Sequence, residues 1–399
     1  MTWVMQPLPE VADLSLGKML DEQKNSGFAM RYLANVNVRW GSIDVADLRE
    51  MRFEQHELDR FSLRYGDIVM CEGGEPGRCA VWKVHDTPMM IQKALHRIRP
   101  RSHIDSSFLF YSLFYAARSG KLAPLFTGAT IKHLPKEKLQ KVQIAVPDLP
   151  TQRRIADILS AYDDLIENNR RRIALLEQAA RELYREWFVR LRFPGHEHVK
   201  IVDGVPEGWK VNQIDEIASV RRGASPRPIN DFMGGPVPWL KIGDATASGS
   251  PFVFATKEGV TEEGARRSVL LADGDLVLSN SATCGIPFFI GMDACIHDGW
   301  LYFKDVKLVS KNFLYLAFQN ERDRMLSGIG EGAVQKNFNT DYVGKQTMLI
   351  PPVSDVLPRF EAEVASMFAM IKLLAVQNSR LSSARDLLLP RLMNGSIAV

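Results

Sequence analysis

Three arginines stand two positions apart in the stretch KALHRIRPRSH at residues 93–103. Because alternate residues of a β-strand point to the same face, a strand here would place Arg97, Arg99 and Arg101 on one side. A guanidinium group can bind two phosphate oxygens through a pair of hydrogen bonds, so this arrangement suits contacts with a nucleic-acid backbone. The alternative is a solvated basic face without a ligand.

Further basic residues lie in loops and in a repeated peptide. The loop SVRRGASPRP at residues 219–228 holds three arginines, and two lysines occupy the same place in the two copies of the repeated peptide. These further candidates for phosphate contact are Arg221, Arg222, Arg227, Arg266, Arg267, Lys132 and Lys336. The net charge of +3 and the pI near 8.6 neither require nor exclude a nucleic-acid partner.

The residue types that perform catalysis do not form a known motif in this sequence. It contains no GxxxxGKS/T phosphate-binding loop, no GxGxxG between a strand and a helix, no HExxH or CxxC ligand set and no GxSxG turn. Asp163 and Asp164 are predicted on the solvated side of a long helix. His96 and His297, in roughly equivalent places in the two halves of the chain, are predicted to be structural. The four cysteines are expected to be reduced thiols, because their spacings do not match metal sites.

The segments that carry these residues are repeated along the chain. GATIKHLPKEKLQKVQIAVP at 128–147 aligns without a gap with GAVQKNFNTDYVGKQTMLIP at 332–351, 204 positions later. At an offset of 206, Trp3, Leu8, Val11, Ala12 and Gly17 match Trp209, Ile214, Ile217, Ala218 and Gly223. YGDIVM at 65–70 matches DGDLVL at 273–278, which predicts a turn followed by an apolar strand in each copy. A period of about 200 is too long for a solenoid repeat and predicts a whole domain that is used twice.

A long helix is predicted after each copy. The first, at 151–190, follows the chain breaker at 147–150, contains no glycine or proline, and would span about 60 Å at 1.5 Å per residue. The second runs from about Leu357 to Met393, and Gly395 is expected to cap its C-terminus.

Apolar residues recur at steps of three and four along both helices, which is the pattern of a coiled-coil seam with a stutter. The seam consists of Ile158, Tyr162, Leu165, Asn169, Ile173, Leu176, Ala180, Leu183 and Trp187 in the first helix, and of Phe360, Val364, Met367, Ile371, Leu374, Asn378, Leu381, Ala384 and Leu388 in the second. Asn169 and Asn378 either form a buried pair that sets the register or lie at the edge of the stripe. Antiparallel pairing would place the two domains at opposite ends of a rod, related by a pseudo-twofold axis.

Length and composition agree with this organisation. A chain of 399 residues with 46% hydrophobic and 24% charged residues is long enough for two domains and typical of a soluble globular protein. No apolar run reaches 18 residues and the N-terminus lacks the features of a signal peptide, so a cytoplasmic protein is predicted. The predicted boundaries are 1–150 for the first domain, 151–192 for the first helix, 193–354 for the second domain and 355–399 for the second helix.

Three segments resemble the specificity subunits of type I restriction-modification systems. IAVPDLPTQRRIADILSAYDDLIENNRRRIALLEQAARELYREWF at 144–188 is similar to the central conserved region of that family, and NSRLSSARDLLLPRLMNGSI at 378–397 is similar to its C-terminal conserved region. PEGWKVNQIDEIASVRRGASP at 206–226 is similar to the segment that opens the second target-recognition domain. The resemblance covers nearly the whole chain, although the variable parts match only in outline.

The resemblance implies an α+β fold of two tandem target-recognition domains, which are mixed α/β heads, separated by two long conserved helices packed as a pseudo-twofold symmetric antiparallel coiled coil. It implies sequence-specific DNA binding without an active site, in which each domain recognises one half of a split double-stranded target and the helices set the spacer. The expected partners are DNA, two methyltransferase subunits and the restriction subunits with motor and nuclease activity. S-adenosylmethionine, ATP and Mg²⁺ would bind to those subunits, and no cofactor is expected on this chain.

The methyltransferase subunits would need a surface on the helices. The charged flank of the first helix is a candidate, made of Arg170, Arg171, Arg172, Glu177, Arg181 and Glu182. Tyr184 and Trp187 would be better anchors if they faced outward, but the seam places Trp187 inward.

Two other interpretations remain open. A DNA methyltransferase or nuclease acting by itself would need a cofactor-binding glycine loop or an NPPY-like or PD-ExK-like motif, and the sequence has none of these. A specificity-like DNA-binding protein or coiled-coil scaffold that acts without methyltransferase and nuclease partners is compatible with the same repeat. Neighbouring methyltransferase and helicase-nuclease genes would favour the specificity subunit over the scaffold.

Overall fold

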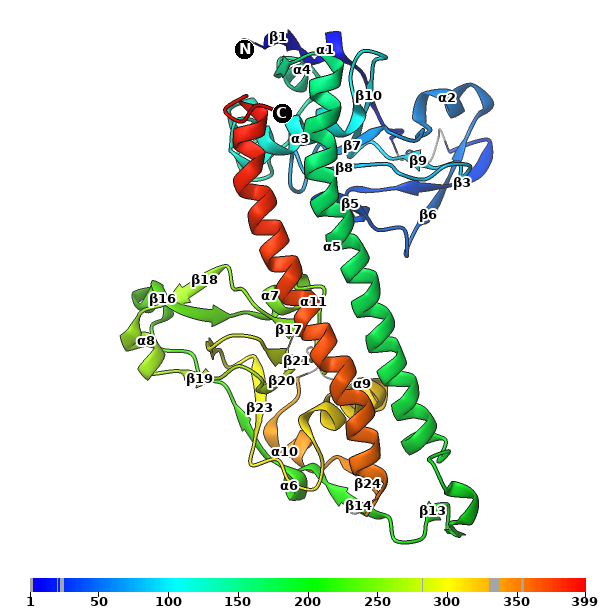
Figure 1. Ribbon diagram of the computed structural model, residues 1–399, viewed down its shortest axis with the longest axis vertical. Coiled ribbons are helices and arrows are strands. Elements are labelled where there is room, and N and C mark those ends of the chain that lie inside the picture. The colour runs from blue at the N-terminus through cyan, green and yellow to red at the C-terminus, as the bar shows by residue number, and fades with distance from the viewer. Residues whose placement is uncertain (1–2, 20, 22–24, 282, 330–336, 353–354) are drawn as a thin grey trace. The chain divides into compact units, whose positions relative to one another are not determined.

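The chain forms two units, each built around one copy of the repeat. The computed structural model describes residues 3–19, 21, 25–281, 283–329, 337–352 and 355–399. Unit 1 comprises Met1–Leu165 and Leu381–Val399, and unit 2 comprises Ile166–Arg380. Each unit holds a mixed α/β domain, and the long helices α5 (Leu149–Tyr184) and α11 (Val356–Met393) contribute a segment to both units (Figure 1). The predicted α+β class, with two tandem domains and two long helices, is confirmed.

The first domain is the part of unit 1 from β1 to β11. Its strands are β1 (Val4–Pro7), β2 (Ala12–Leu16), β3 (Phe28–Leu33), β4 (Val38–Arg39), β5 (Ser42–Ile43), β6 (Arg49–Phe53), β7 (Ile68–Cys71), β8 (Cys79–Val81), β9 (Met90–Ile91), β10 (Leu95–Pro100) and β11 (Gln143–Val146). Its helices are α1 (Leu8–Val11), α2 (Leu58–Phe61), α3 (Ser106–Arg118) and α4 (Lys136–Leu139). The sheets have the orders β2-β10-β7-β8, β6-β3-β9, β1-β11 and β4-β5.

The second domain is the part of unit 2 from β14 to β24. Its strands are β14 (Lys210–Gln213), β15 (Ser219–Arg222), β16 (Met233–Leu240), β17 (Phe252–Val253), β18 (Glu258–Val260), β19 (Val269–Leu271), β20 (Leu276–Ser279), β21 (Pro287–Ile290), β22 (Ala294–Ile296), β23 (Trp300–Lys304) and β24 (Thr347–Ile350). Its helices are α6 (Ile214–Ile217), α7 (Ile242–Ala247), α8 (Glu262–Arg266), α9 (Lys311–Ser327) and α10 (Thr340–Gly344). The sheets have the orders β15-β23-β20-β21-β17, β18-β16-β22-β19 and β14-β24, and the hairpin β12 (Ile201–Val202) and β13 (Val205–Pro206) precedes them.

The two domains repeat one arrangement of strands. The order β2-β10-β7-β8 of the first domain recurs as β15-β23-β20-β21 in the second, and β6-β3-β9 recurs as β18-β16-β22 with a parallel last pair in both. A Cβ atom on Gly17 would lie 2.3 Å from the carbonyl oxygen of Gln92, and one on Gly223 would lie 2.2 Å from that of His297. Only glycine allows the backbone to approach so closely at this position of each copy. The predicted duplication is confirmed in the fold. The predicted equivalence of His96 and His297 is wrong, because the close approach pairs His297 with Gln92.

Helix α5 begins at Leu149, two residues before the predicted start at 151, so that Pro150 lies in its first turn. The carboxylate of Asp148 accepts the backbone N–H of Thr151 at 2.9 Å, which satisfies a donor of the first turn, and the hydrogen bonds from Thr151 hold the pKa of Asp148 below its usual range. A π-helical turn at Arg185–Val189 extends the helix and buries Trp187. The inward position predicted for Trp187 is confirmed. Tyr184 is buried as well, so neither aromatic residue provides an outward anchor.

Helix α11 ends at Met393, as predicted. Gly395 has the positive φ of +70° that is typical of a C-terminal cap. In unit 1 the N-terminal segment of α5 shares a core with the C-terminal segment of α11, and in unit 2 the C-terminal segment of α5 shares a core with the N-terminal segment of α11. The helices are therefore antiparallel in both units (Figure 1).

The predicted seam holds in unit 2, for the second half of α5 and the first half of α11. In the last part of α11, Leu389 and Leu392 are buried in place of the predicted Leu381, Ala384 and Leu388. Ile173 and Ala180 are buried, whereas Ile158 and Leu165 are 37% and 52% exposed. Ile155 is buried in unit 1, within one core that also contains residues of the first domain. The prediction fails in this half because the helix packs against the domain as well as against its partner helix.

All four cysteines, Cys71, Cys79, Cys284 and Cys295, are free and buried, as predicted. Burial raises the pKa of each thiol. Among the described residues, no helix is both long enough and apolar enough to span a membrane.

Candidate functional site

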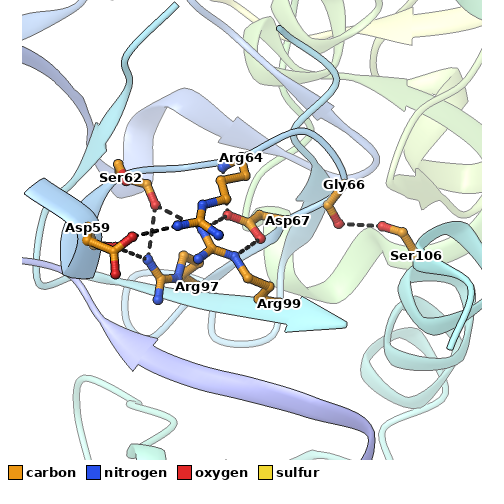
Figure 2. Close-up of polar contacts among 8 residues, drawn as sticks. All are labelled: Asp59, Ser62, Arg64, Gly66, Asp67, Arg97, Arg99 and Ser106. Carbon is orange, nitrogen blue, oxygen red and sulfur yellow. Dashed lines mark hydrogen bonds and ion pairs between the residues drawn. The ribbon is translucent and has the colours of Figure 1, made fainter. Parts of the chain in front are cut away.

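Strand β10 carries Arg97 and Arg99, and both side chains bind groups of their own domain. Arg97 is 8% exposed, and its Nη1 donates to the backbone carbonyl oxygens of Asp59 and Ser62, both at 3.0 Å. The Nε and Nη2 atoms of Arg99 donate to the two carboxylate oxygens of Asp67 at 2.8 and 2.7 Å (Figure 2). This is the bidentate arrangement expected of an arginine that binds phosphate, here made with an internal acid.

Asp67 neutralises the charge at the centre of this cluster. Its side chain is 2% exposed and also accepts the backbone N–H of Arg64 at 2.8 Å. The hydrogen bond with Asp67 raises the pKa of Arg99, whereas burial lowers the pKa of Arg97. Both arginines thus hold β10 to residues 59–67, which lie in α2 and in the loop between α2 and β7. Arg101 is 46% exposed and lies beyond the strand, where it donates to the carbonyl oxygen of Pro9 at 3.1 Å and pairs with Asp13.

In the second domain, Arg221 and Arg222 lie on strand β15, and Arg227 lies in the loop that follows it. The predicted loop at 219–228 therefore begins only after Arg222. Arg222 is 58% exposed and Arg227 is 73% exposed, and their guanidinium groups lie 3.8 and 3.7 Å from the carboxylate of Asp298. The Nε of Arg222 also donates to the backbone carbonyl oxygen of Asp298 at 2.7 Å. Arg221 is exposed and its Nε donates to Ser219 at 3.3 Å. Unlike the pair on β10, these cations remain accessible to a ligand.

The remaining predicted basic residues lie apart from this loop in the chain. Arg266 and Arg267 are exposed at the end of α8, where Arg267 pairs with Glu263 at 2.5 Å and lies over the ring of Phe232. Lys132 is exposed in the first domain. Lys336 lies outside the described residues.

An open pocket of about 310 Å³ adjoins Arg222 in the second domain. Four chain segments form it: the end of β15, the residues after β20, the turn before β23 and the residues before α10. Its lining residues are Arg222, Asn280, Ser281, His297, Asp298, Gly299, Asn337, Phe338 and Asn339. The basic loop and this pocket together form the candidate site of the second domain.

Hydrogen bonds and burial determine the protonation states of Asp298 and His297 in this pocket. The hydroxyl of Ser225 donates to the carboxylate of Asp298 and, with the nearby arginines, holds the pKa of Asp298 below its usual range. Burial lowers the pKa of His297, which favours the neutral ring. The Nδ1 of His297 accepts the backbone N–H of Gly299 at 2.8 Å, so the neutral ring carries its proton on Nε2. The pocket therefore offers both donors and acceptors near pH 7.

Sequence reasoning identified Arg222 as a candidate for DNA contact but missed the asparagines of this pocket. Asn280 directly follows the apolar strand β20, and Asn337 lies within the repeated peptide at 332–351, so both belong to or adjoin segments that the repeat identifies. The signal was available in the alignment of the two copies, but only the fold shows that these edges meet.

The seam asparagines meet in unit 2. The Nδ2 of Asn169 donates to the Oδ1 of Asn378 at 3.0 Å, and Asn169 is 6% exposed. The prediction that Asp163 is solvated is wrong. Its carboxylate accepts the hydroxyl of Tyr111 at 2.6 Å and pairs with Arg385, whereas Asp164 is 63% exposed, as predicted.

The charged flank of α5 is divided between solvent and the second domain. Arg170, Arg171 and Arg172 are exposed, but the carboxylate of Glu177 accepts the hydroxyl of Tyr315 at 2.9 Å. Within the described part of the chain, no group of three or more His, Cys, Asp or Glu residues could hold a metal ion.

Comparisons with known proteins agree on one family. The model of the type I restriction modification DNA specificity domain matches this chain twice, at residues 2–178 and 206–355. The MjaIX specificity subunit of a type I restriction enzyme from Methanocaldococcus jannaschii is 24% identical over 84% of this chain and 78% of its own length. The HindI specificity subunit from Haemophilus influenzae is 24% identical over 72% and 74% of the two chains. The crystal structure of an S subunit from M. genitalium has a TM-score of 0.55 at 17% identity and covers 98% of this chain and 96% of its own, which supports the fold.

Proposed function

The chain belongs to the family of type I restriction modification DNA specificity domains, and from this premise we propose that it is the subunit that reads a split DNA target for a type I complex. Each α/β domain would recognise one half-site, with residues 1–150 and 193–354 as the two recognition domains. Residues 151–192 and 355–399 would supply the helices that set the length of the DNA spacer between the two half-sites. The protein would act in the cytoplasm, where cellular and invading DNA are accessible.

The observation that carries this proposal is the repetition of one fold within one chain. Two domains with the same strand order are joined through two long helices that contact each other in each unit. A single DNA site would require only one such domain. Two domains that recognise one face of the duplex would be centred about 34 Å apart, one helical turn of DNA. Helices of about 60 Å can hold domains at that separation.

DNA binding would combine electrostatic contacts with the phosphates and hydrogen bonds to the edges of the bases. The exposed cations Arg221, Arg222 and Arg227 in the second domain, and Lys132 and Arg101 in the first, would contribute to salt-dependent phosphate binding. Hydrogen bonds to base edges in the major groove would supply the specificity. Arg97 and Arg99 would instead stabilise the first domain, because they are already bonded to Asp67 and to backbone carbonyl groups.

The chain would have no catalytic role of its own. It would position two methyltransferase subunits and the restriction subunits, and those partners would bind S-adenosylmethionine, ATP and Mg²⁺. Exposed leucines on the long helices support a docking role, because Leu175 is 65% exposed on α5 and Leu387 is 72% exposed on α11. The exposed Arg170, Arg171 and Arg172 on α5 lie in the same unit as Leu175 and would contribute charge to docking there.

The test is to co-express the chain with the methyltransferase subunit encoded beside it, to select bound duplexes from a random DNA library, and to map methylation on them. The proposal predicts a split motif with a fixed spacer. Exchange of residues 1–150 for those of another family member should change one half only. Insertion of one helical turn at equivalent points of α5 and α11 should change the spacer and neither half. A single contiguous motif, or no enrichment above non-specific binding at moderate salt, would refute the proposal and favour a scaffold that binds protein.

A further inference from the structure

The two domains share one backbone junction beside the pocket. In the first domain, the N–H of Glu72 donates to the carbonyl oxygen of Ala94 at 2.9 Å, and the N–H of Leu134 donates to the carbonyl oxygen of Glu72 at 2.7 Å. In the second, the N–H of Asn280 donates to Gly299 at 3.0 Å, and the N–H of Phe338 donates to Asn280 at 3.0 Å. The same two hydrogen bonds therefore join the same three segments in each domain.

A third pair of hydrogen bonds fixes the alignment of the junctions. The N–H of Gly17 donates to Leu95 at 3.0 Å, and the N–H of Gly223 donates to Trp300 at 2.9 Å. The matched bonds make residues 72–73, 92–94 and 133–134 equivalent to residues 280–281, 297–299 and 337–338. We call these two sets of residues the first and second junctions.

The apolar side chains at the junctions are retained and the polar ones differ. Leu134 and Phe338 are buried at 0% and 1% exposure, as expected for positions that support the fold. At the polar positions, Glu72, Gln92, Lys93 and His133 of the first junction correspond to Asn280, His297, Asp298 and Asn337 of the second. Because the backbone bonds persist while each of these four side chains changes in type, the polar side chains are not what the shared fold requires.

Several of these side chains are accessible and able to discriminate between bases. His133 and Lys93 are exposed at the first junction, and Asn337 is exposed at the second, where it lines the pocket with Arg222. An asparagine amide can pair with adenine N6 and N7, and arginine or lysine can pair with guanine O6 and N7. A neutral histidine ring offers one donor and one acceptor.

The positively charged side chain at each junction comes from a different segment of the domain. Lys93 in the first junction stands where Asp298 stands in the second, and the second junction takes its cation from Arg222 on the adjoining strand. The equivalent of Arg222 is Leu16, since each directly precedes the glycine of the close approach. Asp298 lies 3.8 Å from the guanidinium of Arg222 and accepts its Nε through the backbone carbonyl group, so it is a positioning residue for that cation.

We propose that the junctions are the base-reading sites of the two domains, with Lys93 and His133 reading one half of the DNA target and Arg222 and Asn337 reading the other. This inference rests on the proposed function and adds the residues that determine specificity. One backbone frame with two different sets of donors and acceptors would let one fold recognise two different half-sites.

The test is selection of bound duplexes by the complex with its methyltransferase subunit, with wild type and the variants His133→Ala and Asn337→Ala compared in parallel. Each variant should relax the preference at one base pair of one half-site by about 5- to 150-fold, the range for loss of a specific base contact, and leave the other half unchanged. The exchange variants His133→Asn and Asn337→His should alter which base is preferred at that position. Lys141→Ala and Lys345→Ala are matched controls, because these lysines are exposed, are identical in the two copies, and do not line the pocket.

The outcomes separate this inference from the proposed function. A split motif in wild type that stays unchanged in all four junction variants, or that weakens uniformly at both halves, would overturn the base-reading role and leave the proposed function intact. The absence of a split motif in wild type would refute the proposed function itself. Circular dichroism and co-purification with the methyltransferase subunit check that each variant is folded, and the exchange variants provide the answer if an alanine variant is not.

Discussion

Replacement of Asp67 with asparagine should strongly destabilise the first domain. The substitution keeps the size of the side chain and removes the charge that faces Arg99 at 2.7 and 2.8 Å. Asp67 is 2% exposed and Arg99 is 19% exposed, so water can solvate the remaining guanidinium only in part. Arg97, which carries a second positive charge, adds to the imbalance because it is almost fully buried on the same strand.

The expected cost is about 3 kcal/mol. Loss of one partner from a buried ion pair costs about 3–5 kcal/mol, and the partial exposure of Arg99 places this case at the lower end. The matched control is Asp59→Asn, which removes the partner of Arg64 at 2.6 Å from a pair that is 83% and 61% exposed (Figure 2). An exposed pair of this kind contributes about 0–1 kcal/mol. The two variants thus compare one buried and one exposed carboxylate within the same network.

Hydrogen exchange measured by mass spectrometry on peptides of β7 and β10 reports the opening free energy of the first domain by itself. Asp67→Asn should accelerate exchange there by about 150-fold, the equivalent of 3 kcal/mol, and leave peptides of the second domain unchanged. Asp59→Asn should change exchange by less than about 5-fold. If both variants exchanged at the same rate, the assignment of Arg97 and Arg99 to structural support would be refuted, and these arginines would return as candidates for DNA contact.

Three other predictions follow from buried polar groups. The Nε2 of His96 donates to the carbonyl oxygen of Leu134 at 2.7 Å, and burial lowers the pKa of His96. The stability that the neutral ring contributes is therefore present above the usual pKa of about 6.5 and is lost as the pH falls through the folded pKa. The free energy of unfolding should decrease below pH ~6.5 in wild type, and less steeply in His96→Gln. The four buried thiols should react with a thiol reagent only on unfolding, and rapid reaction of the native protein would contradict their placement. Asn169→Leu should destabilise the helix pair by about 1–3 kcal/mol because Asn378 loses its partner, whereas the double leucine variant should be near neutral, and exchange rates of helix peptides distinguish the two results.

The repeat and the local rules of helix ends made much of the fold predictable. Matching segments at a nearly constant offset identified the duplication, and the order of strands in the two domains confirms it. The end of α11 at Met393 and its glycine cap also followed from sequence, because capping depends on residues close to each other in the chain.

Interactions between distant residues limited the prediction of the site. The spacing of Arg97 and Arg99 correctly indicated a strand, but Asp67 lies 32 positions from Arg99 and nothing local indicates that it is the partner. Ile158 and Leu165 fit the periodicity of a seam, yet α5 is turned so that Ile155 meets the first domain. The offset of His96 and His297 differed by a few residues from the true one, because loops of unequal length separate the matched segments.

Each domain begins and ends at one place, since β1 pairs with β11 and β14 pairs with β24. Val4 stands opposite Val146, and Lys210 stands opposite Ile350, so the chain enters and leaves each domain through neighbouring strands. Recombination that replaces the coding segment between two such points would insert a complete domain whose two ends fit the helices of the recipient protein. If each domain recognises one half of the target, as proposed, a single recombination event would change one half of the specificity and leave the subunit able to fold.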